Sequence, residues 1–288
     1  MNYQQLIITE PVSNFRTLAR NGIRGRWGDA FLKGALYVLI LGLPAAVIQM
    51  ASGQSGAESA FAQAFADYAG GLITYPELVA YSDDYSKSMG IMYLYQILVA
   101  GALTLGITQI YLRYRRMQQA PYELLFSGFS NYGRAFGLFF LQTLFILLWS
   151  LLLIIPGIIA FYRYRLAFCI LADNPQISPL EAINISKGIM QGNKWKAFCL
   201  DLSFIGWYLL ASFAASLVMM PIAMGAAMAG GISGQSGLSA TPIISIVSLI
   251  AYAFAGGLVD MYQGTSVAAF YERASGILKY HDEITGLE

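Results

Sequence analysis

Charged residues are scarce in this sequence of 288 residues, because Asp, Glu, Lys and Arg together make up only 11% of it. A soluble domain carries about 25%. Hydrophobic residues reach 57%, so the charges are too few to cover an ordinary water-facing surface, and a soluble globular protein is excluded. The net charge of +1 gives no overall basic field, so nucleic acid is not expected as a partner.

Cysteine and histidine are also scarce, with two Cys and one His. Cys169 and Cys199 lie in apolar stretches without metal-ligand spacing, so no metal site is expected. We interpret both as small buried side chains, with a disulfide or lipid attachment as alternatives.

His281 lies in a polar tail beyond the last apolar run, and neither a GxxxxGK[ST] phosphate loop nor an HExxH motif occurs. We predict no catalytic residue and no cofactor, so the protein is not expected to be an enzyme.

Long apolar runs are the main feature of the sequence. A spanning helix needs about 20 mostly apolar residues to cross about 30 Å of hydrocarbon. One run, 135–171, is too long for a single span and is interrupted by Pro156-Gly157, which predicts a helical hairpin with its turn there. The sequence therefore predicts an all-α integral membrane protein with six transmembrane helices, over residues 30–50, 89–112, 135–155, 157–171, 197–220 and 242–262.

The distribution of basic residues predicts the orientation. With six spans and both termini cytoplasmic, every Lys and Arg except Lys87 falls on the cytoplasmic side, as the positive-inside rule requires. Five spans would divide the basic residues almost evenly between the two sides. Residues 1–26 contain four arginines and no uninterrupted apolar core, so a signal peptide is not expected.

Three similar segments precede the outgoing spans, and each places an aromatic residue shortly before Ala-Phe: Trp27, Tyr132 and Trp195. Aromatic residues with polar tips favour the membrane interface, so these are predicted interfacial anchors. They are either independent anchors or the mark of a threefold repeat within one membrane domain. The repeat would comprise three helix-hairpin units, 1–112, 113–172 and 173–288.

A short cytoplasmic helix is predicted before each unit's outgoing span. The clearest begins with Ser178 as N-cap, Pro179 at the first position and Glu181 completing a capping box. The others are expected to start near Ser13 and Pro121. All three are predicted to be interfacial, with basic faces toward anionic lipid.

Two outer connections differ in composition. Residues 51–88 form a long extracytoplasmic loop in which Phe61, Phe65 and Tyr68 have helical spacing, which predicts an amphipathic helix on the outer surface. Residues 225–240 are rich in Gly and are predicted to be a flexible loop. Within the spans, close helix packing is expected at a set of glycines: Gly34, Gly42, Gly101, Gly106, Gly256 and Gly257.

Residues 170–175 read Ile-Leu-Ala-Asp-Asn-Pro, and residues 190–207 read Met-Gln-Gly-Asn-Lys-Trp-Lys-Ala-Phe-Cys-Leu-Asp-Leu-Ser-Phe-Ile-Gly-Trp. With Glu181-Ala182-Ile183 and Ser186-Lys187, this pattern resembles the bacterial membrane family catalogued as domain of unknown function 975. The resemblance extends along the whole chain and is most specific between residues 162 and 207. It implies a bacterial cytoplasmic-membrane protein, and it implies no activity.

Four ionisable residues fall within the predicted spans or at their ends: Arg163, Arg165, Asp201 and Asp260. A charge at the bilayer centre costs at least about 2.5–3.5 kcal/mol on insertion scales, so such residues are expected to pair. We predict a polar cluster toward the cytoplasmic half of the bundle. It either pins helix packing or binds an anionic solute, a lipid headgroup or a proton.

Two functions remain open from the sequence. The first is a non-enzymatic module that binds anionic lipid headgroups, a protein partner or a second copy of itself, as the three basic interfacial helices suggest. The alternative is a transporter or permease for a small solute or lipid, based on the repeat and the Arg/Asp cluster. A buried, water-accessible cavity that reaches Asp201 would favour the second, and a solid, dry bundle would favour the first.

Overall fold

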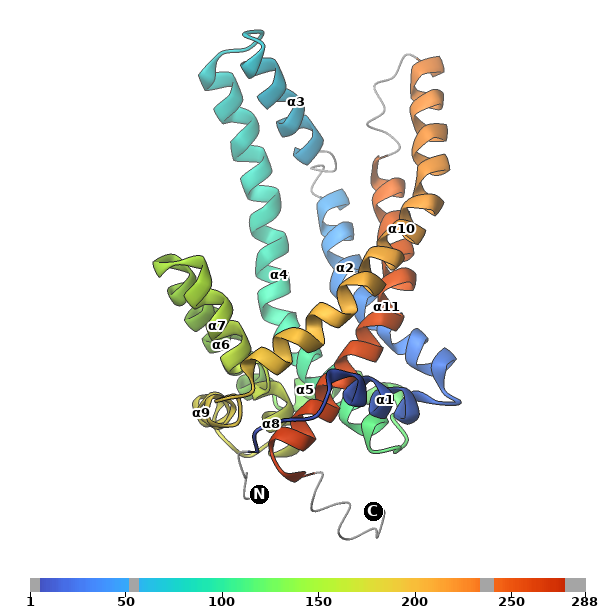
Figure 1. The fold of residues 1–288 in the computed structure, drawn as a ribbon. Helices are drawn as coiled ribbons and strands as arrows, with labels where there is room; N and C mark the ends of the chain where they lie inside the picture. Colours follow the sequence, from blue (N-terminus) through green and yellow to red (C-terminus); the bar gives the residue numbers. More distant parts are fainter. Residues whose placement is uncertain (1–5, 52–56, 234–240, 278–288) are drawn as a thin grey trace. The chain divides into compact units, whose positions relative to one another are not determined.

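A computed structural model describes residues 6–51, 57–233 and 241–277. His281, the lone histidine, lies outside these residues. The elements of the described residues are all helical (Figure 1). They are α1 (Val12–Ile23), α2 (Trp27–Ala51), α3 (Ala57–Ala69), α4 (Tyr75–Arg115), η1 (Tyr122–Phe126), α5 (Ser127–Ser130), α6 (Tyr132–Leu152), α7 (Ile154–Tyr164), α8 (Ala167–Asp173), α9 (Pro179–Ile189), α10 (Lys194–Ser233) and α11 (Thr241–Ala274).

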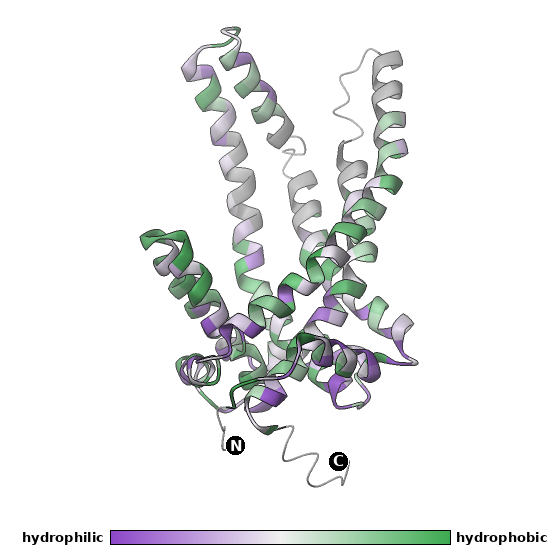
Figure 2. Cartoon of the chain, viewed as in Figure 1, coloured by the Kyte–Doolittle hydropathy of each residue, from purple (hydrophilic) through white to green (hydrophobic). Residues whose placement is uncertain are grey.

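Within the described residues, six helical segments are long and apolar enough to cross a membrane, which confirms the predicted number. The fourth joins α7 to α8 across a two-residue interruption. Figure 2 shows the contrast in hydropathy between the largely hydrophobic α6 and α7 and the hydrophilic positions of α1. The spans are Trp27–Pro44, Tyr93–Arg115, Tyr132–Leu152, Ile154–Asp173, Lys194–Ile222 and Ile246–Ala274.

The helices α6 and α7 form the predicted hairpin, but its turn is not at Pro156-Gly157. The chain turns at Leu153, whose backbone is extended (φ −164°, ψ 152°). Pro156 instead occupies the first turn of α7, where a missing N–H is tolerated. A Cβ on Gly157 would lie 2.1 Å from the hydroxyl oxygen of Ser150, so this glycine allows α7 to fold back closely against α6.

Short helices precede the spans of α2, α6 and α10, as the sequence predicted. Before α10, the side chain of Ser178 accepts a hydrogen bond from the Glu181 N–H at 3.2 Å, and Pro179 follows as the first residue of α9. Before α6, the predicted helix is a 3₁₀ turn, η1, continued by the single turn α5. The first helix, α1, has its N-cap at Pro11.

The two connections that were predicted to lie on the outer side contain more helix than expected. In 51–88, α3 carries the expected amphipathic segment, and α4 starts at Tyr75, well before the membrane span within it. Glu77 caps the start of α4, since its carboxylate accepts a hydrogen bond from the backbone N–H of Thr74 at 2.7 Å, and this bond lowers the pKa of the Glu77 carboxyl. The prediction of a loop from residue 225 is wrong as far as residue 233, because α10 continues to Ser233; residues 234–240 lie outside the described residues.

The chain divides into two compact units. The first comprises residues 1–37, 99–210 and 256–288, and the second comprises 38–98 and 211–255. In the second unit, the hydroxyl of Tyr95 donates to the carbonyl of Ile40 at 2.7 Å, and Gly42 lies against the side chain of Leu249. All the polar clusters considered below lie in the first unit.

Glycines allow close helix contacts in the first unit. A Cβ on Gly34 of α2 would lie 2.1 Å from the carbonyl oxygen of Gly257 in α11, and Gly106 of α4 is equally close to the carbonyl of Leu125. The neighbouring Gly256 has nothing within 4 Å of such a Cβ, so its predicted packing role is wrong. On a helix, adjacent residues are turned by about 100°, and only one of the pair can face α2.

The extended segment before α1 is held by Asn193, a buried residue between α9 and α10. Its side-chain carbonyl accepts from the Ile8 N–H at 2.9 Å, and its amide donates to the carbonyl of Leu6 at 2.8 Å. The Leu6 N–H donates to the carbonyl of Ala274 at the end of α11. This segment therefore joins the ends of two spanning helices.

Candidate functional site

Arg165 lies at the interruption between α7 and α8, inside the fourth hydrophobic span. Its Nη2 is 2.5 Å from Oδ1 of Asp201 in α10. The same oxygen accepts a hydrogen bond at 2.8 Å from the side-chain amide of Gln263 in α11. The guanidinium also lies over the ring of Phe161 at 5.5 Å. The structure thus joins two of the predicted residues, one cationic and one anionic, and neutralises both.

Asp260 is connected to this pair through two residues that the sequence analysis did not single out. The hydroxyl oxygen of Tyr208 lies 2.6 Å from Oδ1 of Asp260 and 2.5 Å from Oε1 of Gln263. The side chains therefore form a continuous hydrogen-bonded chain, here called the polar chain: Arg165, Asp201, Gln263, Tyr208 and Asp260. Tyr208 and Gln263 are uncharged, so counting intramembrane charges could not reveal them.

Arg163, the fourth predicted member, does not join the polar chain. Its backbone carbonyl accepts from the hydroxyl of Ser186 at 3.0 Å, and its side chain lines a separate small hollow with Trp149 and Pro156. Two helical residues of separation turn a side chain by about 200°. Because of this spacing, Arg163 and Arg165 face different directions, and the prediction that both contact the aspartates is wrong for Arg163.

A cavity of about 500 Å³ reaches the polar chain. Arg165, Gln263 and Asp260 all lie in its wall. This volume is within the range of about 300–1,000 Å³ that is typical of small-molecule sites. The remaining wall comes from α2, α4, α6, α7, α8 and α11, and consists of Tyr37, Thr104, Thr108, Tyr111, Phe139, Gln142, Thr143, Ile146, Phe161, Phe168, Cys169, Gly264 and Val267.

The polar groups of this cavity lie near the middle of their hydrophobic spans. Asp260 is central in Ile246–Ala274, Gln142 in Tyr132–Leu152 and Thr104 in Tyr93–Arg115. The side-chain oxygen of Gln142 is buried and has no hydrogen-bond partner among the described residues. A polar cavity at mid-span is unusual because each unsatisfied group there costs several kcal/mol, and such positions commonly mark ligand or ion pathways.

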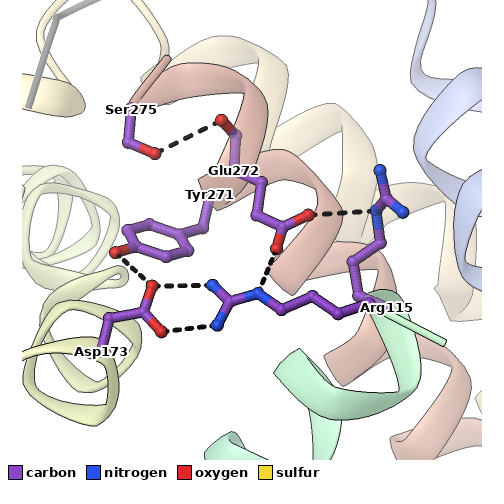
Figure 3. Close-up of polar contacts among 6 residues, drawn as sticks. Arg115, Asp173, Tyr271, Glu272 and Ser275 are labelled. Carbon is purple, nitrogen blue, oxygen red and sulfur yellow. Dashed lines mark hydrogen bonds and ion pairs between the residues drawn. The ribbon is translucent and has the colours of Figure 1, made fainter. Parts of the chain in front are cut away.

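A second charged cluster, unpredicted from the sequence, lies where α4, α8 and α11 end. Arg116 holds both carboxylate oxygens of Asp173, at 2.9 and 2.8 Å, and its Nε donates to Glu272 at 2.7 Å. Figure 3 shows the carboxyl groups of Asp173 and Glu272 turned toward a guanidinium between them, with the hydroxyl of Tyr271 bonded to Asp173. Nε of Arg115 is 3.3 Å from Glu272, an ion-pair distance, but is not oriented for a hydrogen bond.

This end cluster serves structure rather than ligand binding. The Asp173 and Glu272 side chains are only 5% and 4% exposed, and their charges are balanced by the two arginines. Burial alone would lower the pKa of Arg116, but the hydrogen bonds and charges of the two carboxylates outweigh it and raise that pKa. The ion pairs and hydrogen bonds of the cluster therefore tie three helix ends together. The available sequence signal was a Glu at the end of the last span, near arginines that are predicted to be cytoplasmic.

The three predicted interfacial anchors have different surroundings. Trp27 contacts the ring of Tyr262 edge-on at 5.9 Å and is half-buried. Tyr132 stacks between Phe129 and Phe136, at 6.3 and 5.8 Å. Trp195 is 71% exposed and stacks on Phe198 at 5.2 Å. Their depth in a membrane stays a prediction.

Cys169 and Cys199 are both free thiols. Cys169 is buried in the cavity wall, and Cys199 is half-buried. Over the described ranges, no group of three His, Cys, Asp or Glu residues is arranged to hold a metal ion.

Six apolar helices, with ionised groups paired inside the bundle, define an α-helical multi-pass membrane protein. A model of one family, described as protein of unknown function (DUF975), matches residues 150–276. This segment of the chain is similar to that family, which confirms the resemblance over residues 150–276. The match includes every residue of the polar chain. No curated protein matches the sequence, and no solved structure matches it either.

Proposed function

We propose that this protein is a non-enzymatic permease-type membrane protein that binds a small polar solute in the intramembrane cavity. The observation that carries the proposal is the cavity of about 500 Å³ at mid-span, with Arg165, Gln263 and Asp260 in its wall. A bundle that served only as a scaffold gains nothing from placing these groups around open space. Asp201 is not among the residues that line the cavity, but Arg165 and Asp260 of the predicted cluster are, and their position supports the permease alternative.

The interruption at Arg165 supports the same proposal. Breaks in spanning helices are tolerated where the backbone is buried or lines a water-filled cavity, and transporter binding sites commonly use discontinuous helices near the midplane. Here the break places a guanidinium in the cavity wall, and Asp201 balances its charge. With threonine, tyrosine and glutamine side chains in the remaining wall, the site offers donors and acceptors to an uncharged or zwitterionic solute.

Lipid binding is the second candidate, supported by exposed basic and aromatic residues. Arg20 and Arg24 are exposed at the end of α1, and Trp195 is exposed at the start of α10. We place these groups, and both termini, on the cytoplasmic side of a bacterial cell membrane, where anionic headgroups would meet them. A protein partner or a second copy could use the same surface.

A thermal-shift screen of the purified protein separates the two candidates. Binding to the native state raises stability by about 2.7 kcal/mol when the ligand is at 100 times its Kd. We expect neutral amino acids, polyols or organic acids to include a class that raises the Tm of the wild type but not of the double variant Arg165→Gln/Asp201→Asn. Stabilisation by phosphatidylglycerol alone, equal in both proteins, would contradict the permease proposal and favour lipid binding.

A further inference from the structure

Each hydrogen bond of the polar chain has a donor and an acceptor, and Arg165 determines which is which. A guanidinium only donates hydrogen bonds, so Asp201 accepts from Arg165. The neighbouring Gln263 also contacts Oδ1 of Asp201, at 2.8 Å, and a carboxylate there requires a donor. The Gln263 amide nitrogen must therefore face Asp201, because the flipped amide would bring its oxygen against an ionised oxygen.

The orientation of Gln263 determines the hydrogen of Tyr208. With the amide nitrogen at Asp201, Oε1 of Gln263 faces the Tyr208 hydroxyl at 2.5 Å and can only accept. A phenol carries one hydrogen, and this contact uses it. The Tyr208 oxygen still lies 2.6 Å from Oδ1 of Asp260, and two oxygens at that separation need a proton between them.

We propose that Asp260 is a proton-binding site of the cavity, and that its protonated carboxyl donates to the Tyr208 oxygen in this conformation. Loss of that proton would leave an acceptor at Asp260. The Tyr208 hydroxyl would then turn to Asp260 and abandon Gln263, which releases the far end of the chain that holds Asp201 and Arg165. Protonation of Asp260 thereby determines the hydrogen bonding of the solute site. This coupling rests on the proposed function, whereas the protonation of Asp260 does not.

The surroundings of Asp260 agree with a proton rather than a permanent counter-ion. The titratable groups facing it are Tyr37 from α2, Tyr111 from α4 and Tyr208 from α10, and Cys169 from α8 lies in the same cavity wall. All four are neutral when protonated. Arg165 is in the same cavity wall but pairs with Asp201. Among the described residues, the ion pairs include none to Asp260. An ionised carboxylate at mid-span without a cation is costly, and a proton removes that cost.

Infrared spectroscopy of the reconstituted protein tests the proposal without any solute. We expect wild type at pH 7 to show the C=O stretch of a protonated carboxylic acid, shifted in deuterium oxide, and Asp260→Asn to lack it. Tyr208→Phe should keep the band but move it to higher frequency, since the carboxyl loses its acceptor. The control Glu77→Gln, in an exposed capping residue, should leave the band unchanged.

Absence of the band in wild type at pH 7, or its persistence in Asp260→Asn, would overturn the proposal. A band that persists in Asp260→Asn would place the proton on another carboxyl. Because the readout needs no ligand, its failure is separate from a failure of the thermal-shift screen. A titration to alkaline pH completes the test: the band should disappear reversibly in wild type, while Asp260→Asn should show no such band at any pH in the same range.

Discussion

At the scale of residues, the structure separates ionisable groups that pair from one that does not. Asp201 and Arg165 neutralise each other at 2.5 Å, with side chains 18% and 16% exposed. Asp260 contacts only a phenol in the polar chain. The charged cluster predicted from the sequence therefore divides into two parts. One is the ion pair of Arg165 and Asp201, and the other is the carboxyl group of Asp260, our proposed proton site, at the opposite end of the polar chain.

Replacing Asp201 by Asn tests the ion pair. The substitution leaves Arg165 cationic inside the bundle without its partner, and breaking a buried pair by removing one member costs about 3–5 kcal/mol. We expect a marked fall in Tm for Asp201→Asn, measured by thermal unfolding in detergent.

The matched control is the double variant Arg165→Gln/Asp201→Asn, which removes both charges. Its Tm should recover most of the loss, since no uncompensated charge remains. If Asp201→Asn melted at the wild-type temperature, the two side chains would not be an energetic pair.

At the scale of elements, helix crossings in the first unit depend on small residues. The α2–α11 contact brings the backbone of Ala35 to within 2.5 Å of a Cβ built on Gly257. The obstructing atom is a backbone nitrogen, which cannot turn aside as a side chain could. Glycine at this position is thus a requirement of the crossing.

Two adjacent glycines provide the test. Gly257→Ala should lower stability by about 1–3 kcal/mol, because overpacking forces the helices apart. Gly256→Ala meets open space and should be neutral or slightly stabilising, since alanine favours helix. Denaturation of both variants in the same detergent measures the difference, and equal effects would show that α2 and α11 do not cross as described.

The start of a helix was predictable where a single local sequence signal determines it. Ser178, Pro179 and Glu181 predicted the start of α9 because capping depends only on neighbouring residues. The hairpin turn was misplaced by a few residues, since a proline is accepted in the first turn of a helix as readily as in a turn. The helix beyond residue 225 was missed because glycine content alone was taken to indicate a loop.

At the scale of the whole molecule, hydropathy predicted six spans because the bilayer thickness imposes a length on every one of them. The cavity was beyond such reasoning. Its wall combines segments from residue 37 to residue 267. Periodicity in the sequence does not indicate which faces of separate helices pack together. Tyr208 and Gln263 were missed for the same reason: each is an ordinary uncharged residue until Asp260 and Asp201 lie beside it.

The central claim is that water and small solutes reach the cavity between these helices, and single-cysteine labelling tests it most directly. In a background with Cys169→Ser and Cys199→Ser, Thr143→Cys and Val267→Cys place thiols in the cavity wall. Leu148→Cys, on the opposite face of α6 and 50% exposed, is the lipid-facing control. Treated in intact membranes with a water-soluble methanethiosulfonate, both wall positions should react much faster than the control. Reaction no faster than at position 148 would mean a dry, packed bundle, and the permease proposal would be wrong.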